Sequence, residues 1–267
     1  MGSRPSPPAN LEADAPHSHR DAENRAGSER ERLARRTGIR EVVFGVQDGL
    51  LTTLGLTTGV ATATAGSLVA HTTILIAGVL GALAGMVSMG TGAYLATTAA
   101  RDLKHQAIHK ERGELEAQPD EELSEMVAIL AERGVPVDEA SELAQTMARY
   151  PQLWEETHIE KELGISSQIR DTPVRDGLLM AATFLLGAVF PILPYIFMTG
   201  LPAVLVSLAL SGLGLTAVGV LKAAVTGQRL WLGGAQVLLV GGAAALVGYL
   251  FGVLLPHAFG LRLPPTT

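Results

Sequence analysis

The 267-residue sequence contains no cysteine, and this absence excludes two kinds of site. Without thiols the chain forms no disulfide bond and holds no metal through thiolate. Any metal ligand must then be an oxygen, an imidazole nitrogen or a thioether, a donor set that favours Fe²⁺ and Mn²⁺, or Mg²⁺ and Ca²⁺. A basic excess is also missing, since 20 Lys and Arg stand against 26 Asp and Glu, and this argues against a nucleic-acid partner.

Charged residues are nearly absent from two long apolar blocks. Asp48 is the only residue with a formal charge in residues 42–98, and only three basic residues occur in residues 177–267. Residues 101–175, between the blocks, contain 17 acidic and 9 basic residues. Two apolar blocks around one acidic block are typical of a membrane protein with a soluble insertion.

Five apolar segments have the length of a transmembrane helix. At 1.5 Å per residue, segments of about 21–27 residues cross the roughly 30 Å of hydrocarbon in a bilayer. They are Val42–Ala65, Thr72–Thr98, Leu178–Met198, Leu201–Val225 and Leu230–Leu255. The sequence therefore predicts an all-α membrane protein with five transmembrane helices and a helical cytoplasmic insertion between spans two and three.

The basic residues of the connecting segments predict the orientation. Arg or Lys occurs before span one, after span two, before span three and between spans four and five, whereas residues 66–71 and 199–200 contain neither. By the positive-inside rule, the N-terminus and the acidic insertion are cytoplasmic and the C-terminus is outside or lumenal. We expect an integral, multi-pass membrane protein, in the plasma membrane if the source is bacterial.

These boundaries divide the chain into five parts. Residues 1–37, rich in Pro, Ser, Ala and charge, are expected to be a disordered cytoplasmic tail. Residues 38–100 hold spans one and two, residues 101–174 an acidic, helical metal-binding domain, residues 175–257 spans three to five, and residues 258–267 a short tail.

Proline and glycine predict four helices in the insertion. The first continues span two to about Ala117, the second starts at Pro119 and ends at Gly134, the third starts at Pro136, and the last covers about Leu153–Leu163. Apolar residues at helical spacing on the second and third helices are expected to pack together, with their methionines in the core.

Glycines recur four residues apart within the spans, which allows helix backbones to approach closely. The pairs are Gly45/Gly49, Gly55/Gly59, Gly81/Gly85 and Gly248/Gly252. Such spacing indicates tight packing at least as well as it indicates transport.

Asp48 is the single acid inside the first span, where a carboxylate costs about 2.5–3.5 kcal/mol on insertion scales. A cation, a proton or a polar partner usually offsets that cost, so Asp48 is a candidate functional residue. The alternative is a structural ion pair with Lys222. Thr52 lies one turn after Asp48, and span two offers Met89, although core packing is the better explanation for Met89 alone. A carboxylate, hydroxyls and a thioether suit a partly dehydrated Fe²⁺ or Mn²⁺.

Acidic and imidazole side chains recur at helical spacing at both ends of the insertion. Residues three or four apart share a helix face. The pairs are Asp102 with His105, Glu111 with Glu114, and His158 with Glu162. Two such helices facing each other would make a carboxylate-rich site for a divalent ion, as in di-iron bundles, although charged faces are more often simply solvated.

Several of these stretches together resemble the vacuolar iron transporter family of Fe²⁺/Mn²⁺ transporters, from about Gly38 to Leu255. They are REVVFGVQDGLLTTLGL, GMVSMGTGAYLA followed by ARDLKHQ, EKELGIS, LLGAVFPILPY, VGVLKAAVTG and VGGAAALVGYLFG. The resemblance implies a homodimer with a translocation path at its two-fold axis, which exchanges cytoplasmic Fe²⁺ or Mn²⁺ for protons. It implies no enzyme activity and no prosthetic group.

By the same resemblance, Asp48 matches the acid of the family's D-G motif and Met89 the methionine of its S-M-G motif. Glutamates of the family's cytoplasmic domain are matched by Glu111, Glu114 and Glu162, and Asp102 stands where glutamate is common. Three positions depart from the pattern: Gly81 and His105 stand where glutamate is common, and His158 where methionine is common. The second span therefore lacks its carboxylate, which bears on proton coupling and metal choice.

We predict a transporter that exports Fe²⁺, Mn²⁺ or both from the cytoplasm. The predicted ligands are Asp48, Met89, Asp102, His105, Glu111, Glu114, His158 and Glu162. The alternative is a membrane-anchored protein that binds, buffers or senses metal without transporting it, and a third interpretation is transport of a different cation. Flux measurements separate the first two, and competition among metals tests the third.

Overall fold

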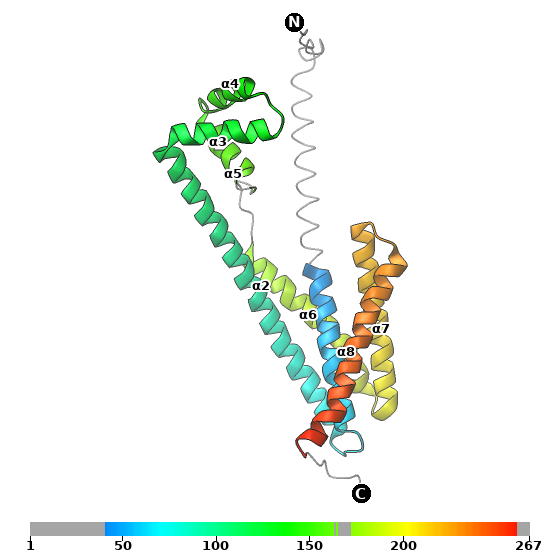
Figure 1. Cartoon of the computed structure of the whole chain (residues 1–267). Helices are drawn as coiled ribbons and strands as arrows, with labels where there is room; N and C mark the ends of the chain where they lie inside the picture. The colour runs from blue at the N-terminus through cyan, green and yellow to red at the C-terminus, as the bar shows by residue number, and fades with distance from the viewer. Residues whose placement is uncertain (1–40, 163, 165–171, 261–267) are drawn as a thin grey trace, which may run out of the picture. The chain divides into compact units, whose positions relative to one another are not determined.

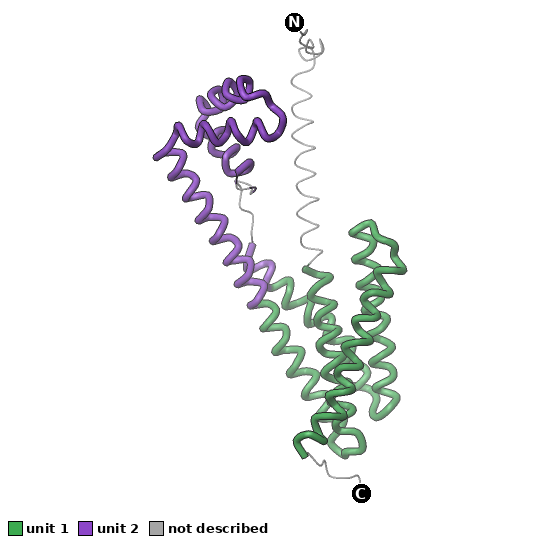
Figure 2. Tube along the Cα trace, in the orientation of Figure 1, with its two compact units in different colours: residues 1–90, 178–267 green, residues 91–177 purple. Residues whose placement is uncertain are grey.

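The computed structural model describes residues 41–162, 164 and 172–260, and all regular secondary structure in these ranges is helical (Figure 1). The predicted tail at residues 1–37 lies outside the described residues. The chain divides into two compact units (Figure 2). Unit 1 comprises residues 1–90 and 178–267, and unit 2 comprises residues 91–177.

Unit 1 contains a helix over residues 41–63 and four further helical segments. These belong to α2 (Ala70–Ala117), α6 (Pro173–Phe197), α7 (Gly200–Thr226) and α8 (Leu230–Ala258). All four labelled helices are long and apolar enough to cross a membrane, which confirms four of the five predicted spans by length and composition. The first predicted span is helical, and its passage through the membrane remains a prediction.

Glycines let the helix of residues 41–63 touch its neighbours backbone to backbone. A Cβ atom added at Gly49 would meet the carbonyl oxygen of Phe184 in α6, and one added at Gly248 in α8 would meet that of Gly55. At Gly59 the added Cβ would lie 3.0 Å from the Gly248 carbonyl oxygen. The glycine spacing in the sequence is therefore explained by helix packing.

Apolar side chains fill the rest of unit 1. One buried group joins the helix of residues 41–63 to α7 and α8, and it consists of Leu50, Leu54, Leu215, Val218 and Val237. Another lies between α2 and α6 and includes Phe184, with Met86 and Met89 packed against it. α6 continues through two prolines, and the Ser207 hydroxyl of α7 donates a hydrogen bond of 2.7 Å to the carbonyl of Pro191.

Unit 2 is built from the C-terminal part of α2 and three shorter helices, α3 (Pro119–Glu132), α4 (Val137–Met147) and α5 (Pro151–Lys161). The predicted continuation of span two is confirmed, because α2 runs unbroken to Ala117. Proline occupies the first turn of α3 and of α5, where its missing N–H needs no partner, and Gly134 has a φ of 92° directly after α3.

The core of unit 2 is small. α3 packs on α4, and Met126, Ala140 and Ala144 are fully buried between them. Met126 is therefore a core residue, as the helical spacing predicted. Ile108 of α2 and Ile159 of α5 are also buried.

Candidate metal centre

Three glutamates converge inside unit 2, and together they are called the glutamate cluster. Glu111 of α2, Glu122 of α3 and Glu162, directly after α5, each place one carboxylate oxygen within 4.8 Å of the other two. Glu111 and Glu122 are buried, with exposures of 2% and 5%, and Glu162 is exposed. Three separate parts of unit 2 thus each bring one carboxylate to the cluster, and two of these carboxylates are buried.

Each of the two buried carboxylates has one oxygen without a hydrogen-bond partner. Oε1 of Glu111 and Oε2 of Glu122 are inaccessible to solvent and have no hydrogen-bond partner. An ionised carboxylate only accepts hydrogen bonds, and leaving one buried without a donor or a cation costs free energy. A cation or a proton among these oxygens would offset that cost.

Burial and mutual repulsion change the acidity of the glutamate cluster. Burial, followed by the charge and hydrogen bond of Glu162 and the charges of Glu122 and Glu114, raises the pKa of Glu111 from 4.5 to about 7. Burial also raises the pKa of Glu122, with a further contribution from Glu125, while His158 opposes the shift. Near neutral pH the cluster therefore retains a proton for part of the time unless a metal ion replaces it.

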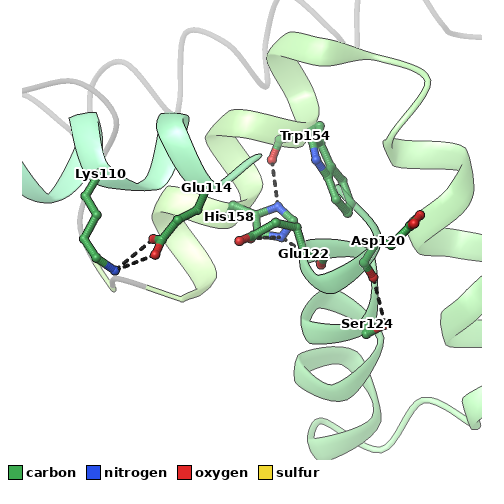
Figure 3. A network of polar contacts seen from close by, with 7 residues as sticks. All are labelled: Lys110, Glu114, Asp120, Glu122, Ser124, Trp154 and His158. Carbon is green, nitrogen blue, oxygen red and sulfur yellow. Dashed lines mark hydrogen bonds and ion pairs between the residues drawn. The ribbon is translucent and has the colours of Figure 1, made fainter. Parts of the chain in front are cut away.

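The nearest lysine and arginine on α2 pair with other acids. Lys110 Nζ lies 2.8 Å and 2.9 Å from the two carboxylate oxygens of Glu114, as Figure 3 shows. Arg112 Nε lies 2.7 Å from Oε1 of Glu155 and so connects α2 to α5. Among the described residues, neither Lys110 nor Arg112 forms an ion pair with the glutamate cluster, so neither neutralises its carboxylates directly.

His158 of α5 lies beside the glutamate cluster and is fully buried. Its Nδ1 is 3.3 Å from the backbone oxygen of Trp154, and its Nε2 is 3.2 Å from the backbone oxygen of Glu122 (Figure 3). The same Nε2 is 3.6 Å from Oε2 of Glu122. Both ring nitrogens therefore face protein oxygens.

Two of the glutamates predicted from sequence, Glu111 and Glu162, come together in the glutamate cluster, and Glu122 joins them. Glu122 is not among the ligands predicted from the sequence, and it lies in the acidic first turn of α3. The available clue was position, because Glu122 lies one turn before the core residue Met126 and so on the buried face. Glu114 is held by Lys110, whereas Asp102 and His105 are exposed on α2 and are not part of the cluster.

Asp48 and Met89 belong to unit 1. Asp48 is half-buried, and the Thr52 hydroxyl one turn later hydrogen-bonds to it. No ion pair joins Asp48 to Lys222 where the structure describes both residues, so the structural-pair alternative finds no support. Met89 packs against the apolar group around Phe184.

Gly81 is the position at which span two lacks the carboxylate expected from the resemblance. A Cβ atom added there would meet the side chain of Leu56, on the helix of residues 41–63. A leucine side chain thus fills the space into which an acid at position 81 would begin to extend. Asp48 is the only acidic residue between residues 42 and 98.

Comparison with known proteins gives consistent results. A family model described as "VIT family" matches residues 39–253. Vacuolar iron transporter 1 of Oryza sativa subsp. japonica is 31% identical over 212 residues, covering 79% of this chain and 82% of the relative. Vacuolar iron transporter 1 of Arabidopsis thaliana is 27% identical over 220 residues, covering 82% and 86%. The vacuolar iron transporter of Toxoplasma gondii is 28% identical over 235 residues, covering 84% and 76%.

Proposed function

The chain belongs to the VIT family, whose members are transporters and not enzymes, and we propose that it exports Fe²⁺, Mn²⁺ or both from the cytoplasm. Family membership and four apolar helices make it an integral membrane protein. The names of its relatives support iron as the transported ion. The oxygen-rich glutamate cluster fits Mn²⁺ as well as Fe²⁺.

The observation that carries this proposal is the glutamate cluster, in which two buried carboxylate oxygens have no hydrogen-bond partner. A divalent ion bound to Glu111, Glu122 and Glu162 would neutralise the repulsion that raises the pKa of Glu111. The exposed Glu162 gives the ion access from solvent, and the two buried carboxylates supply a less hydrated environment. We propose that the cytoplasmic unit captures the ion here before the ion enters the membrane.

The other predicted residues support two further steps of the proposal. Asp102, His105 and Glu114 contribute to a negative field that concentrates cations, since residues 101–175 carry 17 acidic and 9 basic residues. Asp48 and Met89 line the path through the membrane, where a carboxylate and a thioether suit a partly dehydrated first-row ion. The working form is a homodimer in a lipid bilayer, with the path between its subunits.

Proton exchange is the proposed driving reaction. The raised pKa of Glu111 supports it in part, because an ion that enters the glutamate cluster near neutral pH displaces a proton. Basic residues on the connecting segments support a cytoplasmic location of the N-terminus and unit 2. Transport then moves metal from the cytoplasm to the outside or lumen and protons in the opposite direction.

Reconstitution in liposomes tests the proposal. A metal-sensitive fluorophore is enclosed, Fe²⁺ or Mn²⁺ is added outside, and entry is compared with and without an acidic interior and beside Asp48→Ala. We expect entry that accelerates with the acidic interior and is lost in the variant. Competition among divalent ions identifies the preferred one.

Absence of flux from folded protein that still binds metal would overturn transport. It would favour the membrane-anchored protein that buffers or senses metal, consistent with Leu56 occupying the space at Gly81. Entry that ignores the pH gradient would overturn proton exchange alone.

A further inference from the structure

We propose that His158 is a positioning residue for the glutamate cluster, and that it holds Glu122 in place without itself binding the metal ion. The inference depends on the proposed function, since it assigns a role within the same site. His158 sits at the end of α5, four residues before Glu162. That spacing by itself would favour a second ligand on the same helix face as Glu162.

Both nitrogens of His158 face backbone carbonyl oxygens. The Trp154 backbone oxygen lies 3.3 Å from Nδ1, and the Glu122 backbone oxygen lies 3.2 Å from Nε2. Carbonyl oxygens only accept hydrogen bonds, so the ring serves as the donor in these contacts.

The same geometry leaves no space for an ion on the ring. A metal bound to imidazole lies about 2 Å from the nitrogen along the lone-pair direction. At Nε2, that point would fall against the Glu122 carbonyl oxygen, only 3.2 Å away. At Nδ1, it would fall against the Trp154 carbonyl oxygen, 3.3 Å away.

The contacts of His158 instead fix the position of Glu122. Nε2 holds the first turn of α3 through the Glu122 backbone and lies 3.6 Å from Oε2 of its carboxylate. The Trp154 ring meets the imidazole edge-on, with centroids 4.2 Å apart, and limits its rotation. Because the ring is fully buried, it has no alternative water partner.

Together with one ion pair, His158 links the three helices that position the glutamate cluster. His158 joins α5 to α3, and Arg112 with Glu155 joins α2 to α5 at 2.7 Å. Of the described basic side chains, His158 is the one that comes within 4 Å of a carboxylate of the cluster. Partners of this kind, outside the ligands themselves, typically change metal affinity by about 10- to 100-fold.

The test uses the detergent-purified full chain loaded with Mn²⁺, whose unpaired electrons detect directly bound nitrogen by pulsed electron paramagnetic resonance. Mn²⁺ affinity is measured beside it for His158→Gln, which keeps a side-chain N–H donor, and for His158→Met, which keeps volume and a possible ligand but no donor. His109→Gln, at an exposed imidazole of α2, is the matched control.

We expect no nitrogen coupling from His158 in the unsubstituted protein, and affinity in the order His158→Gln above His158→Met, the latter weakened by about tenfold. A nitrogen coupling that disappears in His158→Gln but persists in His109→Gln would make His158 a ligand and overturn the proposal. Equal affinity of His158→Met and His109→Gln would overturn it as well. If the unsubstituted chain does not bind Mn²⁺, the proposed metal site itself is wrong. This outcome differs from the two before it, which concern only the role of His158.

Discussion

The two units of this protein bury different kinds of polar residue. Among the described residues, those buried in unit 1 are serines and threonines, and those buried in unit 2 are Glu111, Glu122 and His158. In unit 1, Thr57 and Thr183 each donate to the backbone oxygen four residues earlier at 2.8 Å, although Oγ of Ser211 has no hydrogen-bond partner. In unit 2, the buried carboxylates of Glu111 and Glu122 each have an oxygen without a hydrogen-bond partner. A hydroxyl carries its own hydrogen and can donate to a nearby carbonyl oxygen, whereas a carboxylate needs a donor or a cation from elsewhere.

The helices are also held together differently. Glycines such as Gly55 and Gly248 bring backbones into contact in unit 1, and apolar side chains fill the remaining space. Unit 2 has a small apolar core and joins its helices through an ion pair and a buried imidazole. Among the described residues, carboxylates converge from separate helices in unit 2, whereas Asp48 is the one acid of unit 1 between residues 42 and 98.

Asp48→Asn tests the role of the single acid between residues 42 and 98, and we expect the largest effect from this substitution. The amide keeps the shape of the side chain and a partner for Thr52 but removes the one formal charge of residues 42–98. We expect Mn²⁺ flux into liposomes to decrease to the level of empty liposomes, while Mn²⁺ binding to the purified protein is retained. Undiminished flux would show that unit 1 has no functional carboxylate and would remove Asp48 from the path.

Gly248→Ala tests the packing of unit 1. The added Cβ would meet the backbone oxygen of Gly55, which cannot move aside as a flexible side chain can. We expect a loss of about 3 kcal/mol, the upper part of the range for overpacking, measured by thermal unfolding in detergent.

Gly242→Ala on the same helix is the matched control, because no atom lies within 4 Å of its added Cβ. Replacing an unconstrained helical glycine should stabilise by up to about 1 kcal/mol. Equal stability of the two variants would contradict the close backbone contact between Gly248 and Gly55.

Glu111→Gln should separate stability from binding in unit 2. The amide removes a buried charge and adds a donor, so we expect the metal-free protein to become more stable. Mn²⁺ affinity should decrease by at least about tenfold, the loss typical of changes near a metal site. Titration calorimetry measures the decrease in Mn²⁺ affinity, and thermal unfolding measures the increase in metal-free stability. Glu116→Gln, exposed on the same helix, is the control. A decrease in stability without Mn²⁺ would mean that the cluster is satisfied without a cation.

The pH dependence of Mn²⁺ binding gives the smallest expected effect. Because folding raises the pKa of Glu111 from 4.5 to about 7, the folded protein binds more protons than the unfolded chain between these values. The contribution of Glu111 to metal-free stability is therefore full below about pH 4.5 and is lost as the pH rises to about 7. Over the same range Mn²⁺ competes better with the departing proton.

We expect Mn²⁺ affinity to increase about tenfold between pH 6 and pH 8 and then to level off. Binding isotherms at several pH values measure this change, and Glu111→Gln should make it smaller. A pH profile shared by the unsubstituted protein and Glu111→Gln would assign the titration to another group.

The amino-acid sequence by itself determined the helices and some of their ends, although α6 begins at Pro173 and not at the predicted Leu178. Apolar length, with almost no charge between residues 42 and 98, predicted membrane spans because hydrocarbon excludes both charge and unpaired backbone. Pro119 and Gly134 marked the ends of α3 because proline lacks a donor and glycine accepts a positive φ. These are local effects, and local chemistry can be read along the chain.

Only the tertiary structure decided which helix faces meet. Helical spacing paired Glu111 with Glu114 and His158 with Glu162. In the structure, Glu114 instead forms an ion pair with Lys110. Glu122, from another helix, lies beside Glu111 and Glu162. The position of Leu56 against Gly81 likewise joins two helices. Periodicity states which residues share a face, and the energy of packing two faces together depends on side chains far apart in sequence.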